Sequence, residues 1–217
     1  MNKIINFILD LLYPSRCILC RKAISPGRPA FCTECREELP GASGVRIKSD
    51  YFSDCVSALY YTPEVRDAVL RYKFGGRESY RFAFGELVAE RIYEELDGKY
   101  DTLSYVPLAP DRRRNRGYDQ AQLIAEEAAK RLGKPCVCVL KKRRGVGAQS
   151  MTVGKEERRA NIAGAYSVPA SADIEGRRIL LVDDVVTTGS TLSECAKTLL
   201  LAGAEDVVCA TLAAASF

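Results

Sequence analysis

Histidine is the residue that this chain lacks: none of its 217 residues is one. Histidine is the commonest general base near neutral pH and a frequent metal ligand. Its absence excludes mechanisms in which a histidine shuttles the proton. Any zinc site in this chain must be built from cysteine or carboxylate ligands.

Long hydrophobic runs are missing as well. The apolar stretch over residues 4–12 is far shorter than the roughly 20 residues that a membrane span requires, and Asp10 interrupts it. No small-residue cleavage site follows it, so we expect a short amphipathic helix packed on the protein, without a membrane span or an export signal. We therefore expect a cytoplasmic protein whose nine cysteines stay reduced.

Four of the cysteines form two pairs with the spacing of zinc knuckles. Two C-x2-C pairs are separated by eleven residues, and two such turns facing each other form a tetrahedral site for four thiolates. The alternatives are a redox pair, which lacks its usual strand–helix setting, and a disulfide framework, which lacks the oxidising compartment. We predict a structural Zn²⁺ bound by Cys17, Cys20, Cys32 and Cys35.

The stretch that carries most of the chemistry begins at residue 179. Residues 179–182 form a continuous apolar run, which suits a strand buried on both faces of a parallel sheet. Asp183 and Asp184 follow, and a loop of small residues then leads into a predicted helix. The free backbone N–H groups of such a loop, together with the helix dipole, suit a phosphate monoester. The loop has no Gly-Lys-Ser/Thr sequence, so it is not a Walker loop.

We predict that this loop binds a ribose 5-phosphate group. The two carboxylates cannot hold an anion, but at the end of a parallel strand they can accept hydrogen bonds from sugar hydroxyls or take part in Mg²⁺ binding. An ordinary helix N-cap with incidental acids is the alternative. The predicted binding residues are Asp183, Asp184, Val185, Val186, Thr187, Thr188, Gly189, Ser190 and Thr191, with Asp183 and Asp184 also as Mg²⁺ ligands.

The middle of the chain is its basic part. Residues 107–160 contain 14 Lys/Arg against 6 Asp/Glu, a local net charge of +8, whereas the whole chain carries +4. Four arginines fall within residues 112–116. Because they cannot all lie on one helical face, we predict a loop, and the planar guanidinium group is well matched to phosphate oxygens. A solvated basic loop is the alternative.

The remaining pattern predicts an α/β protein. Cys136 and Cys138 fall on one face of a predicted strand and are expected to be buried apolar residues. Residues 141–161 are polar and longer than an ordinary connection, which favours a mobile functional loop. We expect strands at 55–61, 103–106, 135–140, 165–168, 179–182 and 206–212, helices at 63–74, 80–97, 118–132 and after residue 190, and two domains, 1–45 and 46–217.

Together these motifs resemble the ComF family of the type I phosphoribosyltransferase superfamily, over nearly the whole chain. The loop after residue 182 is similar to the phosphoribosyl pyrophosphate (PRPP) loop of that superfamily. The family usually has an amide at the position of Asp119. The other matching features are the four-cysteine module, Lys73-Phe74-Gly75, Val106-Pro107-Leu108, Arg112, Arg116-Gly117-Tyr118, Gln149, Arg158 and Asn161.

The resemblance implies a type I phosphoribosyltransferase fold, which is a mostly parallel sheet flanked by helices, behind a small N-terminal zinc ribbon. It also implies binding of PRPP with Mg²⁺, and a cytoplasmic role in the uptake of single-stranded DNA during natural competence, beside a ComFA-like ATPase or helicase. The residues expected to hold pyrophosphate are Leu108, Arg112, Arg114, Arg116 and Gly117.

Two hypotheses of different classes follow. The first is a phosphoribosyltransferase whose acceptor is unknown. The second is a non-catalytic, partner-docking protein that binds single-stranded DNA and uses PRPP as a regulatory ligand. A positive groove with stacking aromatic rings binds single strands. The candidate DNA contacts are Tyr118, Arg143, Arg144, Arg158 and Arg159, with Tyr72, Phe74 and Tyr80 as a nearby aromatic wall.

Overall fold

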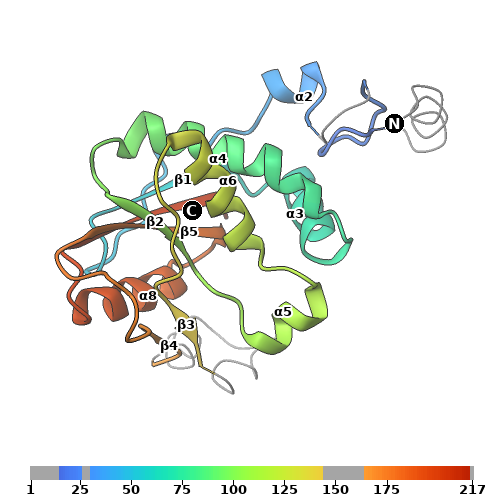
Figure 1. The fold of residues 1–217 in the computed structure, drawn as a ribbon. Helices are drawn as coiled ribbons and strands as arrows, with labels where there is room; N and C mark the ends of the chain where they lie inside the picture. The colour runs from blue at the N-terminus through green and yellow to red at the C-terminus, as the bar shows by residue number, and fades with distance from the viewer. Residues whose placement is uncertain (1–14, 26–29, 144–163, 216–217) are drawn as a thin grey trace.

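A computed structural model describes residues 15–25, 30–143 and 164–215. Among these residues, four parallel strands form a sheet in the order β1-β6-β5-β2 (Figure 1). A separate antiparallel ribbon joins β3 to β4. The strands are β1 Asp54–Tyr60, β2 Thr102–Tyr105, β3 Lys141–Lys142, β4 Tyr166–Ser167, β5 Arg178–Val186 and β6 Asp206–Ala214.

Helices cover both faces of the sheet. Helices α4 and α6 pack together over one face, and α8 lies on the other (Figure 1). This arrangement of a parallel sheet between helices is the predicted one. The helices are α2 Thr33–Glu37, α3 Pro63–Phe74, η1 Glu78–Tyr80, α4 Arg81–Leu96, α5 Pro110–Arg116, α6 Gln120–Leu132 and α8 Ser190–Leu201.

Strand β5 contributes to two hydrophobic cores. Leu180 and Val182 belong to the core under α4 and α6, whereas Ile179 and Leu181 belong to the core under α8. All four side chains are fully buried. Because successive side chains of a strand point to opposite faces, a strand covered on both sides needs an unbroken apolar run. The run at residues 179–182 therefore correctly predicted a central parallel strand.

The ends of two helices follow from short-range chemistry. The Thr62 hydroxyl accepts a hydrogen bond from the Val65 N–H (3.4 Å), and Pro63 occupies the first turn of α3, where its missing N–H has no cost. Asp119 caps α6 in the same way by accepting from the Gln122 N–H (3.3 Å). Both helices were predicted, although α6 begins two residues later than expected.

The prediction of a loop over the arginine cluster is wrong. Residues Pro110–Arg116 form helix α5, with Pro110 at its start and Gly117 (φ 83°) as a left-handed cap. Every residue of α5 is exposed or half-buried. An exposed helix needs no apolar face, so the spread of arginines around it is no argument against a helix.

The predicted strand over residues 135–140 is also not formed. The segment runs along the edge of β2, where the Val137 N–H donates to Leu103 O (2.9 Å), but a single bridge between Leu103 and Cys136 is its one ladder contact with the described strands. Cys136 is half-buried and Cys138 is exposed, so the expected burial of both is wrong. Further along the segment the Val139 N–H donates to the Ser104 hydroxyl (3.4 Å) and not to a backbone carbonyl, so the ladder does not continue.

Some sequence predictions lie outside the described residues. These are the N-terminal helix and nearly all of the 141–161 loop, including Arg144, Arg158 and Arg159. Within the described ranges, each helix is too short or too polar to span a membrane.

Gly85 sets the distance between α4 and α6. A Cβ atom there would lie 2.6 Å from Glu127 Cβ and 3.2 Å from the Ile124 carbonyl oxygen. We expect Gly85→Ala to lower the free energy of unfolding by about 1–2 kcal/mol through overpacking, even though alanine favours helix. The measurement is the urea midpoint. Gly41→Ala is the matched control, because its Cβ would meet no atom closer than 3.7 Å. Equal midpoints for the two variants would contradict this account.

Candidate functional site

The acidic pair lies within β5 and not after it. The strand continues to Val186 because β6 pairs with it along this length, with Asp183 opposite Thr211. The predicted strand stopped at residue 182, where the apolar run ends. Since parallel strands end at one common edge, the carboxylates lie at the edge where ligands bind in α/β sheets.

The loop after β5 forms a small cavity at the start of α8. Its volume is about 220 Å³, and it is lined by Asp183 and residues 185–192. The Thr188 and Ser190 hydroxyls lie 2.8 Å apart. Gly189 has φ 74°, and a Cβ there would lie 2.7 Å from Ile47 Cγ2, so a glycine is required. The loop therefore presents hydroxyl and backbone donors at a helix N-terminus, as predicted for a phosphate site.

A second cavity of about 150 Å³ adjoins the first and shares Asp183 and Thr191 with it. Elements far apart in the sequence meet here, and four of the side chains that line it are cationic. Anions are attracted to such a concentration of positive charge. The charged residues and the tyrosine of this lining are Lys73, Arg112, Arg116, Lys142, Asp119, Asp183, Asp184 and Tyr166.

The two acids of the pair meet different neighbours. Asp184 Oδ1 lies 2.8 Å from Lys73 Nζ, and both side chains are mostly buried. Asp183 has no cation in direct contact among the described residues. Burial, followed by the nearby charge of Asp184, raises the pKa of Asp183 well above its usual range. The oxygens of two adjacent carboxylates are ligands that suit a divalent cation, so Asp183 and Asp184 fit Mg²⁺.

The predicted pyrophosphate residues divide into two groups. Arg112 and Arg116 line the second cavity, and Arg112 makes no hydrogen bond or ion pair with any described residue. Arg114 instead pairs with Asp111 (2.7 Å) on the exposed side of α5. Arg114 and Gly117 line a separate surface hollow. The structure therefore brings only part of the arginine cluster to the acidic pair.

The Asp119 carboxylate binds the backbone N–H of Leu108. The Leu108 N–H, which would be a donor to pyrophosphate, donates to Asp119 Oδ2 at 2.7 Å. Asp119 is 3% exposed, and burial raises the pKa of its carboxyl group. The acid at this position therefore fixes the loop between β2 and α5.

Lys142 and Tyr166 were not singled out from the sequence. They belong to the β3–β4 ribbon, and Lys142 Nζ donates to the Tyr166 hydroxyl at 3.1 Å. Burial, and then the charge of Arg112, lowers the pKa of Lys142. No local pattern marks a lysine in a two-residue strand as a site residue, because only the tertiary fold places it beside Arg112.

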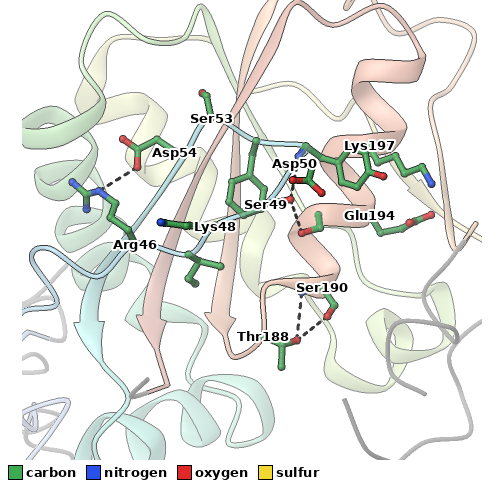
Figure 2. Close-up of a pocket in the computed structure, with 14 residues that line it drawn as sticks. Arg46, Lys48, Ser49, Asp50, Ser53, Asp54, Thr188, Ser190, Glu194 and Lys197 are labelled. Atoms are coloured by element: carbon green, nitrogen blue, oxygen red, sulfur yellow. Dashed lines mark hydrogen bonds and ion pairs between the residues drawn. The ribbon is translucent and has the colours of Figure 1, made fainter. Parts of the chain in front are cut away.

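A larger pocket of about 850 Å³ is lined by residues 46–54 and by side chains of the loop after β5 and of α8 (Figure 2). Thr188 and Ser190 stand at one end, and Ser49 bonds to Ser193 across it (2.9 Å). Its charges are mixed, because three cations and three acids line it: Arg46, Lys48, Lys197, Asp50, Asp54 and Glu194. This mixture lacks the net positive charge that a phosphate requires, so the smaller cavity is the better phosphate site.

The predicted aromatic wall is mostly buried. Tyr72 and Tyr80 are in the core, at 0% and 2% exposed. Tyr118 is half-buried, and its hydroxyl donates to the Tyr72 carbonyl oxygen. Phe74 alone of the three wall residues is exposed, at 67%, with the Arg116 guanidinium 4.7 Å above its ring.

The four predicted zinc ligands converge. The sulfur atoms of Cys17, Cys20, Cys32 and Cys35 all lie within 4.8 Å of one another, and all nine cysteines are free thiols. Burial opposes ionisation of Cys17, but N–H groups of Cys32, Cys20 and Leu19 lower the pKa of its thiol to about 6. Burial and the neighbouring thiols raise the pKa of Cys35 to about 12. Four close sulfur ligands without a histidine fit a structural Zn²⁺.

Comparison with known families agrees with this geometry. Residues 119–216 match the phosphoribosyl transferase domain, and residues 8–45 match the double zinc ribbon domain. The parallel sheet, the four-cysteine cluster and these two matches define a phosphoribosyltransferase-like protein with an N-terminal zinc ribbon.

Three similar proteins indicate which kind of phosphoribosyltransferase-like protein this chain resembles. Competence protein F of Haemophilus influenzae is 27% identical over 88% of this chain and 93% of its own length. Competence protein ComFC of Streptococcus pneumoniae is 33% identical over 68% of this chain and 62% of its own length. The DNA utilization protein YhgH of Salmonella typhi is 28% identical over 90% of each chain. The chain is therefore similar to proteins of the ComF family, within the phosphoribosyltransferase superfamily.

Solved structures show more distant similarity. The B. subtilis glutamine PRPP amidotransferase is 22% identical, with a TM-score of 0.44, over 65% of this chain and 30% of that one.

Zinc content tests the four-cysteine site. We expect one zinc per chain in the wild type and well under one in Cys17→Ser, because a hydroxyl is a poor substitute for a thiolate ligand. Elemental analysis of protein purified without chelator gives the number. Cys138→Ser is the control, since Cys138 is exposed and lies outside the cluster. Full zinc occupancy in Cys17→Ser would show that another ligand set holds the metal.

Proposed function

We propose that this protein binds PRPP with Mg²⁺ at the carboxyl edge of β5. The observation that supports the proposal is the pair of adjoining cavities that share Asp183. One has the donors of a phosphate loop, and the other has four cationic side chains. PRPP carries a phosphate and a pyrophosphate on one ribose, so its chemistry matches two anion sites with acids between them.

Each part of the ligand would meet residues of suitable charge. The 5-phosphate would bind residues 185–191, and the ribose hydroxyls and Mg²⁺ would bind Asp183 and Asp184. The cation supplies charge neutralisation of the pyrophosphate when it is bound. Lys142 and Arg112 would hold the pyrophosphate, with Lys73 and Arg116 beside them.

The reaction class supported by this arrangement is phosphoribosyl transfer. The bond between ribose C1 and the pyrophosphate oxygen breaks, and its electron pair leaves on that oxygen. The lone pair of an acceptor then forms the new bond to C1, and the acceptor's proton is released. Arg112 and Lys142, which line the second cavity, would stabilise the growing negative charge of the leaving group.

The names of the relatives support a role in DNA uptake during natural competence. Two of them are called competence proteins and one a DNA utilization protein. In this proposal the protein acts in the cytoplasm beside a ComFA-like ATPase or helicase, as the family resemblance implies. The PRPP site would serve that role either through transfer or as a regulatory site.

Removal of the acidic charges tests the ligand assignment. We expect the double change Asp183→Asn/Asp184→Asn to weaken Mg²⁺-dependent PRPP binding by about 100-fold or more, because charged hydrogen bonds contribute about 1.5–3 kcal/mol each. Calorimetry measures the affinity. Asp97→Asn is the control, since Asp97 is exposed beside Gly98, whose carbonyl binds Arg178 at the opposite edge of the sheet. Wild-type protein that ignores PRPP, or a double variant that binds normally, would refute the proposal.

A second candidate function is binding of single-stranded DNA. The observation in its favour is Phe74, an exposed ring beside Arg116, which is one of the four cations that line the second cavity. Aromatic rings that stack on bases, together with cations that bind the backbone, are the two parts of a single-strand site. Arg143 is exposed and extends this basic surface, but Tyr118 is packed inward.

Phe74 gives the sharpest test of DNA binding. We expect Phe74→Ala to weaken binding of a thymidine oligomer about tenfold, because stacking contributes about 1–3 kcal/mol per base. Fluorescence anisotropy at several salt concentrations measures it, with log affinity falling by about 0.7 per phosphate per log unit of salt. Tyr93→Ala is the control, as Tyr93 is equally exposed (69%) on α4. Equal losses in both variants would exclude a specific stacking role.

A further inference from the structure

The zinc module is built into the core of the larger domain. Ile18, between two of the zinc ligands, is fully buried in the same core as α3 and α4. The Arg71 guanidinium, in the last turn of α3, donates to the Ile18 carbonyl oxygen at 2.7 Å. Arg71 Nε is buried without a hydrogen-bond partner among the described residues, so this guanidinium depends strongly on the Ile18 contact.

A second contact starts from the same knuckle. Arg21, directly after it, donates to the Tyr80 hydroxyl at 2.8 Å. From Tyr80 a row of packed rings continues through Phe84 (5.8 Å) and Tyr72 (5.3 Å) to Tyr118 (5.5 Å). Packed side chains of this kind transmit displacement because a dense interior has little room to absorb it.

The last turn of α3 joins three parts of the protein through consecutive residues. Arg71 binds the zinc knuckle, the Tyr72 hydroxyl donates to Gln120 O at 3.1 Å, and Lys73 reaches Asp184 at 2.8 Å. Consecutive helical residues point in directions about 100° apart, so one turn can serve three partners. Helix ends fray unless they are held by tertiary contacts.

We propose that Arg71 is a positioning residue that couples the zinc knuckle to the PRPP site. The folded knuckle fixes the Ile18 carbonyl, this carbonyl fixes the last turn of α3, and that turn holds the Lys73 ammonium beside Asp184. Zinc occupancy thereby sets the affinity of the PRPP site without any zinc contact to the ligand. The part that concerns PRPP rests on the proposed function.

The test compares two contacts between the zinc module and the larger domain, Arg71 with Ile18 and Arg36 with Glu90. Arg71→Met removes the hydrogen bond from α3 to the Ile18 carbonyl oxygen, whereas Arg71→Lys keeps a hydrogen-bond donor at this position. Arg36→Met is the matched control: Arg36 pairs with Glu90 (2.6 Å) on α4, where both side chains are more than a third exposed and such a pair contributes little. Each variant is assayed as the full chain for zinc content, PRPP affinity by calorimetry, and amide exchange at Gly75, whose N–H donates to Arg71 O.

We expect Arg71→Met to keep one zinc, to exchange the Gly75 amide faster, and to bind PRPP about tenfold more weakly, with Arg71→Lys between it and the wild type. Arg36→Met should match the wild type. In a Lys73→Met background, Arg71→Met should have no further effect on PRPP affinity. The coupling would be overturned if the losses of PRPP affinity in the two single variants added up in the double variant. Normal exchange of the Gly75 amide in Arg71→Met would also overturn it. A wild type that does not bind PRPP refutes the proposed function, whereas the exchange measurement still decides whether the knuckle fixes α3.

Discussion

The burial of β5 on both faces is the constraint on which the rest of the structure depends. Its alternating side chains enter both cores, and its neighbours β6 and β2 extend along it in parallel. Because the strands are parallel, the end of β5 and the loops that follow β5 and β2 meet at one edge. The acidic pair and the loop after it are therefore neighbours of helix α5 in space, although about 70 residues separate α5 from the acidic pair in sequence.

The charge balance at this edge bears on the choice between the two proposed ligands, PRPP and single-stranded DNA. Lys73 neutralises Asp184, whereas Asp183 and the buried Asp119 have no cation in direct contact within the described part of the chain. Arg112 and Lys142 are likewise cations without a carboxylate partner there. A ligand that brings both phosphate groups and a divalent cation satisfies both sets. DNA would satisfy only the cations, so the PRPP proposal accounts for more of the site.

The sequence by itself determined the features that depend on local patterns. The apolar run at 179–182 determined the central strand, and the spacing of the cysteines determined the zinc site. Pro63 marked the start of α3, and the small residues after the acidic pair marked the loop that leads into α8. Each of these signals lies within a few neighbouring positions. The exposed helix α5 escaped prediction because a helix without a buried face leaves no periodic pattern in its sequence.

Only the tertiary structure decided which residues share the site. Lys73 and Asp184 are 111 positions apart, and Lys142, Tyr166 and Ile47 have no local signal that connects them to the acidic pair. The fold also separated residues that the sequence had grouped: it brought Arg112 and Arg116 to the cavity, turned Arg114 to solvent, and buried Tyr72. The reason is physical. Local patterns report backbone preference and burial, whereas contact across a chain depends on how whole elements pack.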